Sequence, residues 1–133
     1  MQLLVNIDVP DLDAAITFYT QAFDLRLSRR LFDGDVAELL GGPAPLYLLH
    51  NPGGSTACMG VERDYRRHWT PLHLDFVVED LPLACDRVLA AGARSEGAIR
   101  NEVWGRIASF ADPFGHGFCL LQWQGRGYAE VSR

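Results

Sequence analysis

The chain has 133 residues, of which 48% are apolar and 22% are charged, a composition typical of globular proteins with a sizeable core. Its formal net charge of −5 argues against a nucleic-acid-binding protein, because affinity for phosphates depends on clustered Lys and Arg. No apolar run approaches the roughly 20 residues that cross a bilayer, and the start lacks a basic segment followed by a long apolar one. We therefore expect a cytoplasmic protein with no membrane partner.

The cysteine content indicates reduced thiols and no disulfide framework. The chain carries three cysteines, an odd number with no spacing typical of a metal site, at Cys58, Cys85 and Cys119. Reduced thiols are the usual state in a reducing compartment, which agrees with a cytoplasmic location.

The first half of the chain predicts a strand, a helix and three further strands. Residues 2–9 alternate, so that Leu4, Asn6 and Asp8 share one face of the first strand. A helix should begin after Asp11, which can cap it. Its expected buried stripe is Leu12, Ala15, Ile16, Tyr19 and Phe23. Strands are expected at 25–31, 35–40 and 45–50, separated by Gly-containing turns.

The second half predicts the same order. Residues 51–71 are rich in Gly, Pro and charge and are the expected connection, with the charged run at 63–68 interpreted as a solvated loop. A strand is expected at 72–78, followed by a helix from Asp80 that closes at Ala91-Gly92. Its expected inward residues are Leu81, Ala84, Val88 and Leu89. Strands should follow at 95–103, 105–111 and 117–123, with a turn at 112–117 and a loose tail at 124–133.

These elements describe a duplicated unit, because residues 4–12 return in pattern as residues 73–81. The expected fold is α+β with two βαβββ modules, at 1–50 and 72–123. Each module leaves one face of its sheet without a helix. Two such faces must meet or curve around a cavity, because an uncovered apolar sheet is unstable.

Three motifs together resemble the vicinal oxygen chelate superfamily, which includes glyoxalase I, bleomycin-resistance proteins and extradiol dioxygenases. They are Asp11-Leu12 with Phe18-Tyr19, the run HLDFVVED at 73–80, and Asp112-Pro113-Phe114-Gly115-His116. The resemblance covers residues 2–123. It implies that the two modules form a curved eight-stranded mixed sheet, an open cup, and that the protein is a homodimer with or without exchange of modules between chains.

The resemblance also implies where a metal would be bound. The four ligand positions of metal-dependent members fall here on Leu4, Tyr47, His73 and Cys119. Only His73 keeps a ligand of the family type, so we expect no metal and no cofactor; the alternative is one divalent metal, Zn, Mn or Fe. His73 has three interpretations: a former ligand that hydrogen-bonds its neighbours, a group that binds or polarises substrate, or a true ligand acting with Asp75 or Cys119.

Strand alternation gives the residues that face the expected cavity. Asp8 and Asp75 are either a paired acid and base or carboxylates at the rim that cap backbone amides, and Asp8 can equally recognise a cationic group. Cys119 is either a small core residue or a nucleophile, the latter only if His73 contacts it as a base. Among the aromatic residues, Tyr47 and Trp123 face inward. The expected ligand-binding residues are Asn6, Asp8, Tyr47, His73, Asp75, Cys119 and Trp123.

The resulting functional hypothesis is a small-molecule-binding protein of the glyoxalase/bleomycin-resistance type. It would capture an aromatic or cationic organic ligand in the cup without a metal. The alternative is a metal-dependent lyase, isomerase or dioxygenase of the same superfamily, in which the metal acts as a Lewis acid. The sequence assigns no catalytic residue.

Overall fold

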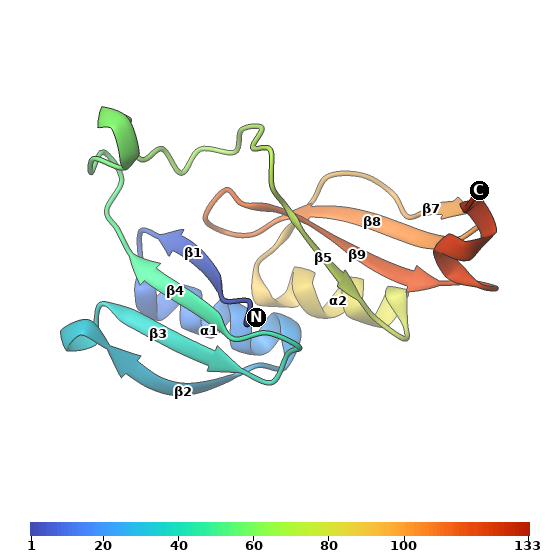
Figure 1. Cartoon of the computed structure of the whole chain (residues 1–133), viewed down its shortest axis with the longest axis horizontal. Helices are drawn as coiled ribbons and strands as arrows, with labels where there is room; N and C mark the ends of the chain where they lie inside the picture. Colours follow the sequence, from blue (N-terminus) through green and yellow to red (C-terminus); the bar gives the residue numbers. More distant parts are fainter. The chain divides into compact units, whose positions relative to one another are not determined.

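The computed structural model describes all residues, 1–133, and divides them into two units, Met1–Arg66 and Arg67–Arg133. Each unit contains one α-helix and one mixed sheet; Figure 1 shows the first in blue to green and the second in yellow to red. The two units correspond to the two expected modules, and each is described by itself. No helix in either unit has the length and apolar character needed to cross a membrane.

The first unit is a four-stranded sheet with a helix on one face. Its elements are β1 (Val5–Val9), α1 (Leu12–Phe23), β2 (Arg26–Leu31), β3 (Val36–Leu40) and β4 (Leu46–His50). The strand order is β1-β4-β3-β2, with β1 and β4 parallel and the other pairs antiparallel. Helix α1 packs against β3 and β4 (Figure 1).

Local chemistry sets the ends of α1 and the face that it buries. The Asp11 carboxylate accepts a hydrogen bond from the Ala14 backbone N–H at 3.0 Å and so caps the first turn. The helix ends at Asp24, which adopts a left-handed conformation with φ of 56°. The helix-facing side chains of the sheet include Leu39 and Leu48, both fully buried. The expected strand–helix–strand order and the capping residue are confirmed.

The second unit repeats the order of strands and helix found in the first, except that the strand after its helix is divided into two short strands. Its elements are β5 (Leu74–Val77), α2 (Leu81–Ala91), β6 (Arg94–Ser95), β7 (Arg100–Glu102), β8 (Gly105–Ala111) and β9 (Gly117–Trp123). The order is β5-β9-β8-β6, with β7 also paired to β8, and β5 and β9 are parallel. Helix α2 packs on β8 and β9.

Two expectations for the second unit were wrong in detail. The single strand expected at 95–103 is two short strands, because the Ser95 hydroxyl and Gly97 bond to each other in a local turn. In α2 the buried residues are Leu81, Cys85 and Val88, while Leu89 is exposed, because the buried face follows the i, i+4, i+7 spacing.

The tail is ordered, contrary to the expected loose end. Residues Gly127–Val131 form a 3-10 helix that brings the Tyr128 ring to 4.6 Å from the Trp123 ring and 5.1 Å from the Trp104 ring, measured between centroids. These ring contacts connect the short terminal helix to β9 and to Trp104.

The expected turn at 112–117 is confirmed and has a clear physical cause. Asp112 is fully buried, and its Oδ1 accepts hydrogen bonds from the backbone N–H groups of Phe114 at 2.8 Å and His116 at 2.9 Å. The side chain thereby satisfies two donors that the turn would otherwise leave unpaired inside the protein.

The connecting residues divide between the units. Residues 51–66 pack on the first unit, where the Tyr65 hydroxyl donates to the Asn51 carbonyl oxygen at 2.7 Å. Arg67 is bound to Glu96 and belongs to the second unit. The charged run at 63–68 is therefore more than a solvated loop. Arg63 is bound to Asp8 in the first unit, and Arg67 is bound to Glu96 in the second unit.

Candidate functional site

The helix-free face of the first sheet carries a row of polar side chains in cross-strand register. Asn6 on β1 pairs with Tyr47 on β4, Tyr47 pairs with Glu38 on β3, and Glu38 pairs with Arg29 on β2. Glu38 accepts hydrogen bonds from Arg29 Nε at 3.0 Å, from Arg29 Nη2 at 3.1 Å and from the Tyr47 hydroxyl at 2.7 Å. The Glu38 side chain is only 7% exposed, so this carboxylate is a fixed part of the face.

These contacts set the protonation states of Glu38 and Tyr47. The Arg29 hydrogen bonds, with a further contribution from Tyr47, hold the pKa of Glu38 below its ordinary value, so Glu38 is ionised at neutral pH. The Glu38 hydrogen bond and burial raise the pKa of Tyr47, which keeps the phenol protonated as the donor. The Tyr47 hydroxyl is therefore engaged with Glu38.

Asp8, the other polar residue expected on this face, is engaged as well. Its Oδ2 accepts from Arg63 Nε at 2.7 Å, and its Oδ1 accepts from Asn51 Nδ2 at 3.0 Å. An arginine of the same unit thus occupies the position where a cationic ligand group was expected. Asp8 and Asp75 lie in different units, and each has its own basic partner.

The helix-free face of the second sheet brings three of the expected residues together. Asp75 on β5 pairs with Cys119 on β9, and Cys119 pairs with Ser109 on β8. His73 directly precedes β5, and its Nε2 lies 3.2 Å from Asp75 Oδ1. The potential ligand atoms of His73, Asp75 and Cys119 all lie within 4.8 Å of one another. This cluster is the densest group of expected site residues in either unit.

The surroundings of Cys119 favour its protonated thiol. Burial raises its pKa, the nearby Asp75 carboxylate adds to the rise, and a hydrogen bond with Ser109 at a sulfur–oxygen distance of 3.5 Å opposes it. A nucleophilic cysteine needs a lowered pKa, so these surroundings do not support a nucleophilic role for this thiol.

A pocket of about 220 Å³ adjoins this cluster. Its lining residues are Arg67, Trp69, Thr70, His73, Glu96, Ser109, Phe110, Gly117, Phe118 and Cys119. All belong to the second unit. Strands β8 and β9 supply one wall, and the segment that precedes β5 supplies Arg67, Trp69 and Thr70.

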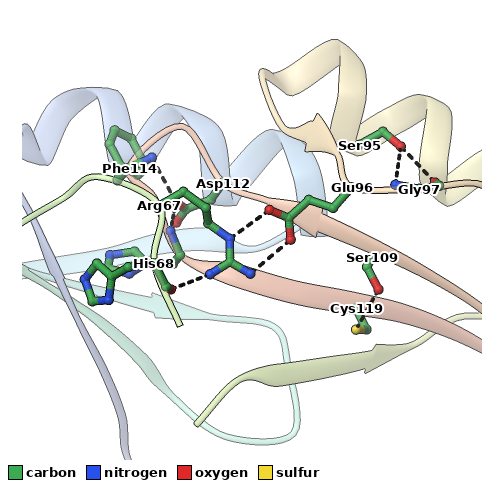
Figure 2. A network of polar contacts seen from close by, with 10 residues as sticks. Arg67, His68, Ser95, Glu96, Gly97, Ser109, Asp112, Phe114 and Cys119 are labelled. Atoms are coloured by element: carbon green, nitrogen blue, oxygen red, sulfur yellow. Dashed lines mark hydrogen bonds and ion pairs between the residues drawn. The ribbon is translucent and has the colours of Figure 1, made fainter. Parts of the chain in front are cut away.

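An ion pair fixes the segment that precedes β5. Arg67 donates from Nε to Glu96 Oε2 at 2.8 Å and from Nη2 to Glu96 Oε1 at 3.0 Å, and its Nη1 donates to the His68 carbonyl oxygen at 2.6 Å (Figure 2). The guanidinium lies against Gly117, where an added Cβ would be 2.4 Å from Nη2. Arg67 holds the pKa of Glu96 below its ordinary value, so the pair is charged at neutral pH.

The remaining expected residue, Trp123, contributes to a different feature. Its ring contacts Trp104 and Tyr128, and it is not among the residues that line the pocket. Sequence reasoning missed Glu38, Arg67, Glu96 and Ser109. Glu38 carried a usable signal, because it is the one charged residue of an otherwise apolar strand, Val36–Leu40.

The comparisons with known proteins agree with this architecture. The sequence model of the glyoxalase-like domain family matches residues 4–121. The chain belongs to the glyoxalase-like domain family. The resemblance to the vicinal oxygen chelate superfamily is thereby confirmed, and so is the α+β fold of two βαβββ modules. No curated protein matches the sequence.

Solved structures share this glyoxalase/bleomycin-resistance fold at low identity. A glyoxalase family protein from Bacillus cereus has a TM-score of 0.73 and 21% identity over 94% of this chain and 95% of its own. The fosfomycin resistance protein FosX from Listeria monocytogenes has a TM-score of 0.71 and 20% identity over 93% of each chain. The antibiotic binding protein TnmS3 from Streptomyces sp. CB03234 has a TM-score of 0.66 and 24% identity over 93% of this chain and 96% of its own.

The metal-ligand pattern of the family does not fit this glyoxalase-like chain. Leu4 has no ligand atom, and the Tyr47 hydroxyl donates a hydrogen bond to Glu38. His73 and Cys119 keep potential ligand atoms, but Leu4 and Tyr47 supply neither an imidazole nor a carboxylate, so the four-ligand set of the family is incomplete in this chain.

Proposed function

We propose that this glyoxalase-like chain is a small-molecule-binding protein that captures an aromatic organic ligand in the pocket of its second module. The observation that carries the proposal is the lining of that pocket, in which one exposed aromatic ring meets several polar side chains. The ring is Trp69, which is 81% exposed, and the polar groups include His73, Glu96 and Ser109. Small-molecule sites combine apolar walls with a small number of placed polar groups in this way.

The size of the pocket sets the size of the bound group. Pockets that hold drug-sized ligands typically measure about 300–1,000 Å³, and this one measures about 220 Å³. It therefore suits one ring system, either a small aromatic molecule or the aromatic end of a larger one. The exposed Trp69 indole supplies a face on which such a ring can stack.

A carboxylate beside the pocket favours a ligand with a cationic group. The Glu96 carboxylate is already paired with Arg67 through both of its oxygens. The Asp75 carboxylate, which lies beside His73 at the adjoining cluster, is therefore the partner that we expect for a cationic group. An ammonium group next to an aromatic ring would meet both kinds of partner.

The experiment compares three probes of matched size: phenethylamine, 3-phenylpropionate and 2-phenylethanol. Affinity is measured by ligand-observed NMR on the full chain and on two variants. Trp69→Ala should weaken phenethylamine binding by about 1–2 kcal/mol, the range of an aromatic contact together with lost burial. Phe32→Ala removes an exposed ring from the first unit and is the matched control. Equal affinity for phenethylamine in the wild type and in Trp69→Ala would show that this pocket is not the binding site.

A metal-dependent lyase, isomerase or dioxygenase remains the second candidate. The observation that favours it is the convergence of His73, Asp75 and Cys119 donor atoms next to the pocket. The two candidates differ in what happens to the ligand. After incubation with the metal-loaded protein, mass spectrometry should detect the unchanged ligand if the protein only binds it. It should detect a product of different mass or structure if the protein is an enzyme.

The expected homodimer is part of the same proposal. Members of the superfamily build cups from paired modules, and a second copy of this chain would provide additional modules for pairing. Light scattering coupled to gel filtration measures the mass directly, and a single species at the 14.8 kDa of one chain would contradict a stable dimer.

A further inference from the structure

The guanidinium of Arg67 is bound by Glu96 and lies against Gly117. Glu96 accepts hydrogen bonds from Nε at 2.8 Å and from Nη2 at 3.0 Å, the bidentate geometry that gives arginine–carboxylate pairs a defined orientation (Figure 2). Gly117 begins β9, and a Cβ at this position would lie 2.4 Å from Nη2 and 2.9 Å from Cζ of Arg67. The guanidinium therefore occupies the space that a side chain at position 117 would fill.

Both partners of Arg67 are fixed to the sheet of the second unit. Glu96 directly follows β6, and its backbone N–H donates to the Ser109 carbonyl oxygen in β8 at 2.9 Å. Gly117 pairs with Ala111 in the β8–β9 ladder. The side chains of Arg67 and Glu96 are 36% and 32% exposed, so salt screens this pair less than it screens a fully exposed one. The ion pair therefore connects Arg67 to a rigid framework.

The residues that follow Arg67 depend on this connection for their position. Residues 68–72 belong to no helix or strand, and the Trp69 side chain is 81% exposed. Arg67 Nη1 also donates to the His68 carbonyl oxygen at 2.6 Å, so the fixed part extends one residue into the segment. At its other end the segment is fixed where β5 begins. A loop that is tethered at both ends has fewer conformations than the same loop tethered at one end.

We propose that Arg67 is a positioning residue for the pocket, whose ion pair with Glu96 keeps Trp69 where a bound aromatic ring can stack on it. This role rests on the proposed function, because Trp69 supplies the face on which the ligand stacks. A segment that moves between several positions presents that face for only part of the time. Apparent affinity falls in proportion to the fraction of protein that is competent to bind, so loss of the ion pair weakens binding although Trp69 itself is unchanged.

Gly117→Ala separates this role from the effects of charge. The backbone φ of Gly117 is negative, and the three atoms nearest to the added Cβ all belong to Arg67, whose flexible side chain can move aside. The methyl group should therefore displace the guanidinium while both charges and the fold are kept. We expect Gly117→Ala to weaken phenethylamine binding by at least about threefold, the result of an equal fall in the competent fraction. The midpoint of thermal unfolding should change little.

The order of the segment is measured without ligand, by ¹⁵N relaxation of the Trp69 and Thr70 amides in the full chain. Arg67→Ala and Gly117→Ala should each lower the heteronuclear NOE of these amides. The double variant should match Arg67→Ala alone, because the methyl group acts through the guanidinium. Arg66→Ala removes a neighbouring arginine that is 89% exposed, and it should leave both amides unchanged.

Three results would overturn the inference. They are unchanged relaxation in Arg67→Ala, an effect of Gly117→Ala that persists when Arg67 is absent, and unchanged phenethylamine affinity in Gly117→Ala when the segment has become mobile. Failure of the proposed function is a different observation, namely no phenethylamine binding in the wild type. The relaxation experiment contains no ligand, so it decides whether Arg67 orders the segment in either case.

Discussion

Arg63 reaches back across 55 residues to place its Nε 2.7 Å from Asp8 Oδ2, at the end of the first strand. The Arg63 side chain is 21% exposed, and it also donates from Nη1 to the Thr56 carbonyl oxygen at 2.8 Å. The Arg63 guanidinium therefore bonds both to another residue of the connecting segment 51–66 and to β1.

Removal of this anchor should loosen the connection with little effect on global stability. Because Asp8 is partly exposed, we expect Arg63→Ala to lower the free energy of unfolding by about 1 kcal/mol or less. Proteolysis within 51–66 should nevertheless become several-fold faster, because local opening of this segment no longer has to break the Arg63–Asp8 ion pair. Arg66→Ala is the matched control, because Arg66 is 89% exposed and pairs only with its neighbour Asp64. Equal cleavage rates in the two variants would contradict the anchoring role.

The buried carboxylate of Glu38 should make the first unit sensitive to acid. Arg29 and Tyr47 lower its pKa in the folded state, so its stabilising contribution is present above the unfolded-state pKa of about 4.3 and is lost as pH falls through the lower folded-state value. We expect Glu38→Gln to be less stable than the wild type at pH 7, and the gap to narrow below pH 4. Chemical denaturation midpoints of both proteins across this pH range measure the difference in stability. A difference that does not change with pH would show that ionised Glu38 is not the source of the stabilisation.

Asp112 should be the most sensitive position of the 112–117 turn. Asp112→Ala leaves the Phe114 and His116 N–H groups without their acceptor in a buried position, which should cost about 1–3 kcal/mol of unfolding free energy. Asp112→Asn keeps a side-chain oxygen acceptor and should cost clearly less. Thermal unfolding of the two variants decides the matter, and equal losses would mean that the oxygen acceptor is not what stabilises the turn.

Gly105 is required by close backbone contact between β8 and β9. A Cβ at this position would lie 2.4 Å from the Gln122 carbonyl oxygen, and backbone cannot move aside as a flexible side chain can. We expect Gly105→Ala to destabilise the protein by about 1–3 kcal/mol, the usual cost of overpacking. Gly53→Ala, whose Cβ would meet only Tyr65 at an ordinary 3.8 Å, is the control and should change stability little.

The sequence predicted the architecture well because its signals are local or repeated. The alternation at 2–9, the Asp11 and Asp80 caps and the 112–117 turn each depend on neighbouring residues, and the structure contains all of them. Repetition of the pattern then indicated two modules. The break at Ser95–Gly97 was missed because it depends on one hydroxyl, whose hydrogen bonds have no strong sequence signature.

The site was harder to predict because its partners are distant in sequence. Alternation placed Asp8 and Tyr47 on the helix-free face correctly, but it could not reveal that Arg63 and Glu38 already engage them. Arg67 was interpreted as part of a solvated run, and its partner Glu96 lies 29 residues away. Cross-strand register, which alternation alone does not give, is what brings Asp75, Cys119 and Ser109 into one row.

If the pocket of the second module binds the ligand, its lining residues should respond when the ligand is added. ¹H–¹⁵N NMR of the full chain during titration with phenethylamine measures this response residue by residue. We expect the largest chemical-shift changes at Trp69, Thr70, His73, Ser109 and Gly117. Changes centred on Asn6 and Tyr47 in the first unit, or scattered over both units, would contradict it.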